Sequence, residues 1–559
     1  MTKPWLEYRD FESYEDFRDN YKIDIPENFN FGFDCIDERA LLTPDAPALI
    51  WNSEKETDED RTYTFRELSE LSDAAARYFT SLGIGKGDMV MLIMKRRAHF
   101  WFSILGLIKI GAVAIPATHH LTFEDISYRN NAAGVKAIIS VDDAKVQKAI
   151  ERSMNTSPGV KHLIRIGDEL ADAPFLTRKW ENLDNGIRAN LAGPKPLRVT
   201  ENGDMMLLYF TSGTTGMPKM VLQNQLYALA HSTTAKYWHN LRPDSVHLTM
   251  SDTGWGKAAW GKLFGQWLVG CTVVVYDHEK LRVHSLLKII EKNKITSFCA
   301  PPTVYKIVIT ADFRKYDLSA LEYATSAGEP LNEEVFNKFL ALTGIKIHEA
   351  YGQTETTAIV LTTPYTEPKA GSLGKPNPIY DLRFLDAEGR EVPVGTEGEM
   401  CIVSNPGDLG VFMGYYQNAE MTEDAWAAGV YHTGDLAVMD EDGYITFIGR
   451  SDDIIKSAGY RIGPFEVESI VQEHPAVLEC AVTGVPDPLR GQNIKVSIIL
   501  NEGYEASDAL SREIRAFVKA NAAAYKIPRI IEFVGELPKT ISGKVRRIEL
   551  REKGEKNNE

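Results

Sequence analysis

The stretch YFTSGTTGMPKMV, residues 209–221, places four hydroxyl side chains, two glycines and a Pro-Lys pair directly after an apolar run. Glycine lets the backbone turn tightly, so several N–H groups converge on one anion, and Ser and Thr hydroxyls add donors. Lys219 adds a positive charge suited to phosphate oxygens. A Walker A loop is excluded, because Lys219 lies between Pro218 and Met220 and GxxxxGK[ST] does not occur. The same composition is also typical of a flexible surface loop, so the rest of the chain must decide.

Length and composition restrict the class of protein. A chain of 559 residues is long enough for at least two domains, and 44% apolar with 25% charged residues is typical of a soluble globular protein. A formal charge of −16 argues against nucleic acid or an anionic membrane as partner. Five scattered cysteines and an acidic, aromatic N-terminus without signal-peptide character predict a cytoplasmic protein with reduced thiols.

One apolar segment, residues 100–117, is long enough to be tested as a membrane span. Lys109 lies near its middle, and a Gly/Ala/Pro-containing stretch ends it. A buried helix followed by a buried strand explains this pattern better than a transmembrane helix.

The alternation of helical and strand-like patterns along the chain predicts an α/β fold. Helical spacing over residues 65–84 and 284–294 alternates with short apolar runs at 88–94, 135–140, 271–277 and 295–302. This alternation favours parallel sheets covered by helices. From about Asp381 the pattern indicates a hairpin-rich β subdomain, and beyond Gly449 a compact α+β unit, with a disordered tail at 551–559. We therefore predict a large N-terminal domain, residues 1–451, and a small mobile C-terminal domain, residues 452–559, with a hinge near Asp452.

Six segments in order resemble the motifs of the adenylate-forming superfamily, which contains acyl-CoA synthetases, luciferases and peptide-synthetase adenylation domains. They are TSGTTGMPK (211–219), SAGEP (326–330), EAYGQTET (349–356), YHTGD (431–435), GRSDDIIKSAGYRIGPFEVE (449–468) and PKTISGKVRR (538–547). Within the superfamily, YGQTET, GYRIGPFEVE and SDTGWGKAAWGK (251–262) are similar to the medium-chain acyl-CoA synthetase branch.

The resemblance implies ATP, Mg²⁺ and coenzyme A as the small molecules used, and a reaction in two halves. A carboxylate attacks the α-phosphate of MgATP to give an acyl-adenylate and pyrophosphate, and a thiol then displaces AMP. It also implies the ATP-binding set: Thr211, Ser212, Gly213, Thr214, Thr215, Gly216, Lys219, Gly328, Glu329, Pro330, Glu349, Ala350, Tyr351, Gly352, Gln353, Thr354, Asp435, Arg450 and Lys544.

Particular roles follow from the same resemblance. Glu355 holds Mg²⁺, Thr354 contacts the α-phosphate, Asp435 accepts hydrogen bonds from the ribose with Arg450 nearby, and Lys544 is the catalytic cation. An ammonium on a long stem suits the approach of two anions. Read without the motif, Lys544 is one basic residue of a cationic segment. No general base is needed, because the substrate carboxylate is already ionised at pH 7.

The C-terminal domain of the family takes two orientations, one for each half-reaction, and Asp452 matches the hinge. The resemblance also implies a set of residues that bind coenzyme A: Ala458, Gly459, Tyr460, Arg461, Arg490 and Lys519. For Lys519 a solvated helix face is an equal alternative. Ala458 stands where relatives commonly have a small polar residue.

The acyl pocket is predicted from Gly352, Trp238, Trp255, Lys257, Trp260 and Cys299. Acetate-specific relatives have a tryptophan at the position of Gly352, so we expect room here for more than acetate. Three tryptophans would shorten and widen the cavity, which favours medium, branched or aromatic acids; a structural role in the core is the alternative. Lys257 either lines the acyl tunnel or points to solvent.

Other readings stay open at this point. They are an amino-acid- or aryl-adenylating enzyme that delivers to a carrier protein, a luciferase-like oxygenase, and a non-catalytic nucleotide sensor. No carrier-like segment follows Arg547. We expect a carboxylic acid and coenzyme A as partners, no nucleic acid, no stable membrane insertion and, as a possible assembly, a homodimer.

Overall fold

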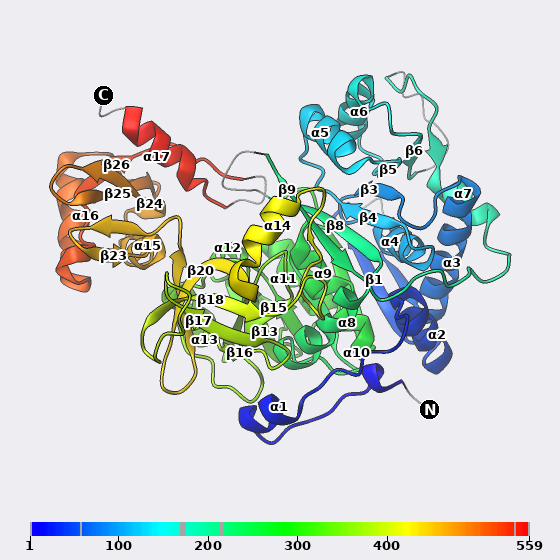
Figure 1. Ribbon diagram of the computed structural model, residues 1–559, viewed down its shortest axis with the longest axis horizontal. Helices are drawn as coiled ribbons and strands as arrows, with labels where there is room; N and C mark the ends of the chain where they lie inside the picture. The colour runs from blue at the N-terminus through cyan, green and yellow to red at the C-terminus, as the bar shows by residue number, and fades with distance from the viewer. Residues whose placement is uncertain (1–2, 56–58, 168–174, 212–216, 541–543, 557–559) are drawn as a thin grey trace.

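The computed structural model describes residues 3–55, 59–167, 175–211, 217–540 and 544–556. A large body carries the two largest sheets, and the C-terminal elements form a smaller lobe beside it (Figure 1). The predicted α/β class, with a β-rich subdomain and an α+β C-terminal part, is confirmed. Asp452 lies between the last strand of the β-rich part and the first strand of the small lobe. Its assignment as domain boundary and hinge stays a prediction.

Two sheets of mostly parallel strands form the large body. The first has the order β19 (Gly414–Tyr415), β9 (Lys219–Asn224), β8 (Met205–Thr211), β4 (Val113–Pro116), β3 (Met89–Ile93), β5 (Ala137–Ser140), β6 (His162–Arg165) and β7 (Glu181–Asn182). The second has the order β16 (Lys375–Pro376), β15 (Ala358–Leu361), β14 (Ile347–Gly352), β13 (Tyr323–Ala327), β12 (Ser297–Cys299), β10 (Val246–Thr249), β11 (Thr272–Asp277), β1 (Pro47–Ser53) and β2 (Arg61–Thr64).

Two smaller sheets follow in the chain. An antiparallel sheet contains β17 (Asp381–Leu385), β18 (Glu397–Val403), β20 (Tyr431–Met439) and β21 (Ile445–Arg450). The sheet of the small lobe contains β23 (Tyr460–Ile462), β22 (Ile455–Ser457), β25 (Gly491–Leu500), β24 (Val477–Asp487) and β26 (Ile530–Phe533).

Helices cover these sheets. Those of the large body are α1 (Tyr14–Asn20), α2 (Glu38–Leu42), α3 (Phe65–Ser81), α4 (His99–Lys109), α5 (Phe123–Ala133), α6 (Ala144–Ser153), α7 (Leu183–Ala189), α8 (Leu226–Thr233), α9 (Gly256–Lys262), α10 (Gly265–Val269), α11 (Val283–Lys292), α12 (Pro302–Val308), α13 (Glu333–Thr343) and α14 (Ala419–Ala425). The small lobe has α15 (Pro464–Gln472), α16 (Asp508–Asn521) and α17 (Arg547–Lys556).

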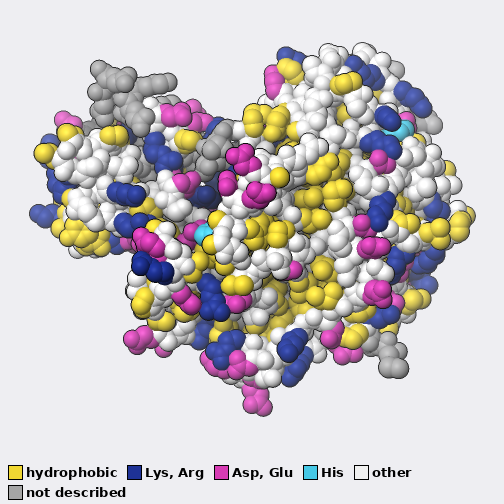
Figure 2. Space-filling view, viewed as in Figure 1, with side chains coloured by type: hydrophobic (Ala, Val, Ile, Leu, Met, Phe, Trp, Pro, Cys, Tyr) yellow, Lys and Arg dark blue, Asp and Glu magenta, His cyan; other side chains and the backbone are white. Residues whose placement is uncertain are grey.

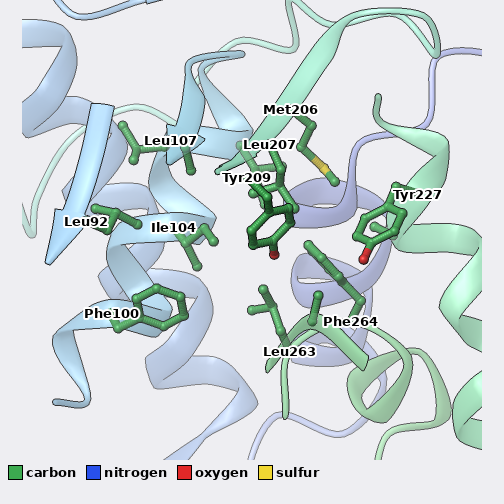
Figure 3. Close-up of a cluster of buried hydrophobic side chains, with 14 of the residues drawn as sticks. Leu92, Phe100, Ile104, Leu107, Met206, Leu207, Tyr209, Tyr227, Leu263 and Phe264 are labelled. Atoms are coloured by element: carbon green, nitrogen blue, oxygen red, sulfur yellow. The ribbon is translucent and has the colours of Figure 1, made fainter. Parts of the chain in front are cut away.

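The core lies around α4, which packs against α3 and against β4 of the first sheet. Figure 3 shows Phe100 and Ile104 of α4 facing Leu207 of β8, with Phe264 and Tyr227 on the other side. Residues 100–117 thus form a buried helix and a buried strand, as predicted. Among the described residues, no helix combines the length and apolar character needed to cross a membrane.

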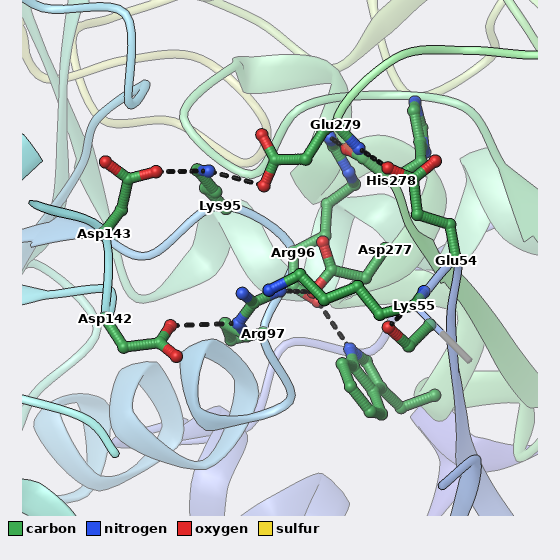
Figure 4. Close-up of polar contacts among 12 residues, drawn as sticks. Glu54, Lys55, Lys95, Arg96, Arg97, Asp142, Asp143, Asp277, His278 and Glu279 are labelled. Atoms are coloured by element: carbon green, nitrogen blue, oxygen red, sulfur yellow. Dashed lines mark hydrogen bonds and ion pairs between the residues drawn. The ribbon is translucent and has the colours of Figure 1, made fainter. Parts of the chain in front are cut away.

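A charged belt joins the carboxyl edges of the two large sheets (Figure 4). Lys95, just after β3, lies 2.8 Å from Asp143 after β5 and 2.6 Å from Glu279 after β11. Arg97 pairs with Asp277 at the end of β11. These contacts hold the two sheets side by side at the edge where, in parallel α/β folds, ligands bind.

The C-terminal tail differs from the prediction. Residues 551–556, expected to be disordered, continue helix α17. The helix is anchored upstream, because Leu550 is buried against Ala481 and Leu537, and Arg547 pairs with Glu468 at 2.8 Å. Tertiary contacts therefore order a segment whose composition alone favours disorder.

Candidate active site

The predicted phosphate loop connects two antiparallel strands. Thr211 ends β8 and pairs in register with Lys219, which begins β9. Of the predicted loop residues, Ser212, Gly213, Thr214, Thr215 and Gly216 lie outside the described residues. The Lys219 ammonium lies 5.1 Å from the ring centroid of Tyr415, on the neighbouring strand β19.

Tyr415 connects this cation to the predicted metal ligand. Its hydroxyl donates to Glu355 Oε1 at 3.0 Å. Burial raises the pKa of the Glu355 carboxyl, while Tyr415 and Lys219 act in the opposite direction. The backbone oxygen of the preceding Thr354 accepts from Gln223 Nε2 at 2.7 Å, which fixes the turn after β14. Sequence reasoning missed Tyr415, although an aromatic pair in the segment GYYQ is a visible signal.

Asp435 is one of the buried acids of the predicted nucleotide site. It is buried in β20 and paired in register with Arg450 of β21. Tyr351 donates to one of its carboxylate oxygens, and Gln353 Nε2 donates to the same oxygen at 2.7 Å. Burial raises the pKa of Asp435, whereas Arg450 lowers it. The structure thus joins the YGQTE and YHTGD segments through direct hydrogen bonds.

The ends of β13 and β14 bring the remaining predicted ATP residues to one edge of the second sheet. Gly328 follows β13 with a positive φ of 102°, a conformation that glycine adopts without strain. Glu329 and Pro330 follow it, and Glu349 and Ala350 lie in β14. Glu349 Oε1 accepts from the Leu331 backbone N–H at 3.0 Å, which ties the end of the SAGEP segment (326–330) to β14.

Glu349 provides a pH prediction. Its side chain is buried, and burial raises its pKa from 4.5 to about 8. Because the folded chain keeps this proton up to about pH 8 while the unfolded chain releases it near pH 4.5, stability falls as the pH rises through that window. The slope from one group is at most about 1.4 kcal/mol per pH unit. Urea unfolding of wild type and Glu349→Gln at a series of pH values checks this. The variant is expected to show the shallower loss, and two parallel curves would contradict it.

Lys544 reaches the site from the small lobe. Its backbone closes a tight hairpin, because Thr540 N–H donates to Lys544 O at 2.7 Å and Lys544 N–H donates to Thr540 Oγ1 at 3.1 Å. The side chain is exposed, and its positive charge lowers the pKa of both Asp435 and Lys257. Lys544 of the small lobe therefore acts electrostatically on residues of the large body. Figure 2 shows the face hollowed where the small lobe meets it.

The predicted coenzyme A residues all belong to the small lobe, but they do not form one cluster. Ala458 and Gly459 form the turn of the β22–β23 hairpin, both with positive φ, and Ala458 N–H donates to Arg490 O at 2.8 Å. Tyr460 stacks on Tyr525 with centroids 4.4 Å apart. Arg461 instead pairs with Glu397 of the large body at 2.9 Å, and Lys519 lies exposed on α16.

Arg490 also lines a cavity of about 240 Å³ in the small lobe. The cavity is lined in addition by Arg515 and Arg529, and the Nε atoms of Arg490 and Arg515 are buried without a hydrogen-bond partner among the described residues. Sequence reasoning missed Arg515 and Arg529, because they are separated in sequence and meet only in the folded lobe. Lys519 does not line this cavity.

Several of the predicted acyl-pocket residues are packed into the core next to β14. Trp238, Trp260 and Cys299 are buried, and the indoles of Trp238 and Trp260 meet edge to face at 6.1 Å. A Cβ on Gly352 would lie 2.5 Å from the Trp260 ring and 2.3 Å from Thr357 O. The space beside Gly352 is therefore filled by Trp260. The expectation that glycine at this position leaves room for acids larger than acetate stays a prediction.

Comparison with known proteins agrees with this fold. The family model for AMP-binding enzymes matches residues 36–416, and that for the AMP-binding enzyme C-terminal domain matches residues 466–544. The chain belongs to the AMP-binding enzyme family.

Individual relatives span nearly the whole chain. It is 38% identical to the mouse (Mus musculus) acyl-coenzyme A synthetase ACSM3, mitochondrial, over 98% of this chain and 94% of the relative. It is 42% identical to 4-hydroxybutyrate–CoA ligase 1 of Metallosphaera sedula, over 91% and 87%. The solved structure of the anthranilate CoA ligase AuaEII with anthranoyl-AMP is similar with a TM-score of 0.85 and 29% identity, covering 95% of this chain and 98% of that one.

Proposed function

We propose that this protein is an AMP-forming acyl-CoA synthetase that activates a short- or medium-chain, branched or aromatic carboxylic acid with ATP and transfers it to coenzyme A. The observation that carries the proposal is the joining of the YGQTE and YHTGD segments at Asp435, whose carboxylate accepts hydrogen bonds from Tyr351 and Gln353. The names of the relatives, which are acyl-, hydroxyacyl- and aryl-CoA ligases, support it.

In the first half-reaction, a carboxylate oxygen bonds to the α-phosphorus of ATP and pyrophosphate leaves. Two anions approach, so the site must supply positive charge in a partly water-excluded space. We assign this task to Lys544, with Lys219 on the pyrophosphate side. Asp435, held by Tyr351 and Gln353, would accept hydrogen bonds from the ribose.

The donor set fits one Mg²⁺ ion. Glu355 offers a carboxylate oxygen, and Tyr415 orients that carboxylate. Mg²⁺ prefers oxygen ligands and keeps several waters, so one protein carboxylate together with phosphate oxygens suffices. When bound, the ion would neutralise phosphate charge during pyrophosphate release.

In the second half-reaction the thiol sulfur of coenzyme A bonds to the acyl carbon and AMP leaves, while the thiol proton passes to solvent. The cavity of Arg490, Arg515 and Arg529 has the charge to bind the phosphates of coenzyme A. The β22–β23 hairpin lies in the lobe that we expect to rotate about Asp452. Arg450 Nε donates to Asp452 Oδ1 at 2.9 Å, which ties the hinge to the site in the present orientation.

Pyrophosphate release with ATP and Mg²⁺, with and without coenzyme A, tests this function against acetate, butyrate, 2-methylbutyrate, octanoate, benzoate and palmitate. We expect coenzyme-A-dependent turnover that peaks on one of the intermediate or aromatic acids. Coenzyme-A-independent release that peaks on an amino acid would indicate delivery to a carrier protein, and no release would indicate a nucleotide sensor. The cytoplasmic location and the homodimer stay predictions; the ACSM relatives are named as mitochondrial proteins.

A further inference from the structure

Glu399, Cys401 and His432 form a cluster of three metal-binding side-chain types that the proposed reaction does not use. Cys401 of β18 is paired in register with His432 of β20, and Glu399 lies two residues before Cys401. Side chains alternate between the two faces of a strand, so Glu399 and Cys401 share one face. Among the described residues, these three are the one group of His, Cys, Asp or Glu whose ligand atoms all lie within 4.8 Å of one another. No sequence motif marks the cluster, because Cys401 and His432 are 31 residues apart.

The donor atoms lie close to the spacing of a tetrahedral zinc site. Cys401 Sγ lies 3.5 Å from His432 Nδ1, and this nitrogen lies 3.0 Å from Glu399 Oε2. Zn²⁺ bonds of about 2.3 Å to sulfur and about 2.0–2.2 Å to nitrogen and oxygen, at tetrahedral angles, place ligand atoms about 3.3–3.6 Å apart. Three protein ligands leave the fourth position of the ion for a water molecule.

Hydrogen bonds outside the cluster orient two of its side chains. His432 Nε2 lies 3.2 Å from Ala427 O, an oxygen that can only accept, so Nε2 carries a proton and Nδ1 faces the other two side chains. Glu399 Oε1 accepts from the Gly434 backbone N–H at 2.8 Å, which leaves Oε2 toward His432. Outer partners of this kind fix the ring orientation and the tautomer of metal-binding histidines.

The alternative to a metal ion is a proton on Nδ1. His432 would then be an imidazolium paired with Glu399, and Cys401 would be a buried thiol without a role as ligand. One proton on Nδ1 can point to only one of its two neighbours, whereas a metal ion bonds to all three side chains. Burial and the Glu399 charge raise the pKa of the Cys401 thiol, so binding of the ion must release the thiol proton to solvent. The side chains of His432 and Glu399 are 27% and 22% exposed, which gives an ion a path from solvent.

We propose that Glu399, Cys401 and His432 bind one Zn²⁺ ion, with water as the fourth ligand. The thiolate and the imidazole select a softer cation than Mg²⁺, which prefers oxygen ligands. The bound ion cross-links β18 and β20 close to Asp435, which lies three residues after His432 in β20. This site goes beyond the proposed acyl-CoA synthetase function, because neither substrate nor nucleotide takes part in it.

Zinc titration of the purified full-length protein, freed of metal by a chelator, tests the site. Competition with a chromophoric chelator, in the absence of nucleotide, is expected to show one Zn²⁺ ion per chain. Cys401→Ser and His432→Gln should each weaken binding by at least about 100-fold, because each removes a direct ligand and even outer-shell changes cost 10- to 100-fold. Co²⁺ bound in place of Zn²⁺ should give a thiolate-to-cobalt charge-transfer absorption in wild type that Cys401→Ser lacks.

His162 provides the matched control, because it faces a glutamate without a thiol nearby to complete a metal site. Its Nδ1 lies 3.5 Å from Glu181 Oε1, and the two side chains are 20% and 17% exposed, close to the values of the proposed ligands. His162→Gln is expected to keep the wild-type Zn²⁺ affinity.

Two results would overturn the zinc site: absence of stoichiometric Zn²⁺ binding by wild type, or an affinity that both ligand variants retain. If neither ligand variant folds, the wild-type cobalt spectrum decides, and a spectrum without the charge-transfer absorption rejects Cys401 as a ligand. None of these results bears on pyrophosphate release, so failure of the zinc site and failure of the proposed function are told apart.

Discussion

Replacement of Lys544 by alanine is expected to slow acyl-adenylate formation by about 100- to 1,000-fold, the range seen when one preorganised transition-state donor is removed. The reason is that two anions meet in this step and Lys544 supplies a positive charge, which already acts on the Asp435 carboxyl. Single-turnover formation of the adenylate, followed by pyrophosphate release, measures the effect.

The second half-reaction separates this role from a general loss of structure. Thioester formation from added acyl-adenylate and coenzyme A should be nearly unchanged in Lys544→Ala, because that step does not bring two anions together. Lys539, five residues earlier, is the control: its ammonium pairs with Glu479 at the surface, 2.8 Å away, and Lys539→Ala should leave adenylation intact. Adenylation at near-normal rate in Lys544→Ala would reject Lys544 as the catalytic cation.

Replacement of Lys109 by alanine is expected to lower the free energy of unfolding by about 3–5 kcal/mol, the cost of removing one partner from a buried ion pair. The Lys109 ammonium is fully buried and lies 2.8 Å from Asp37 Oδ1, with Asp73 also in contact. Without the cation, two largely buried carboxylates repel each other in a poorly solvated space. Urea unfolding followed by tryptophan fluorescence measures the change.

Lys195 tests whether burial is the cause. It contacts the other oxygen of Asp37 at 3.0 Å, but its side chain is 65% exposed. Lys195→Ala should therefore cost less than about 1 kcal/mol. Equal losses in the two variants would show that the acids are stabilised by net charge alone and would contradict the buried-pair argument.

Local patterns were sufficient for much of the fold. The apolar run and Lys109 at 100–117 predicted the buried helix α4 and strand β4, and the segments at 65–84, 88–94 and 271–277 matched α3, β3 and β11. These elements could be predicted because a helix or strand that buries one face must repeat its apolar residues at the period of that element. The tail was missed because α17 depends on contacts of Leu550 and Arg547 with residues far away in the sequence, Ala481 of β24 and Glu468 of α15.

The sequence by itself determined the class of this protein and the list of candidate residues, because the motifs are contiguous and each carries its chemistry in a few neighbouring side chains. Only the tertiary structure decided how these residues meet. It joined Gln353 to Asp435, placed Trp260 in the space beside Gly352, and gathered Arg490, Arg515 and Arg529 around one cavity. Such contacts join residues far apart in the chain, and their distances are set by strand order and packing, which local sequence does not encode.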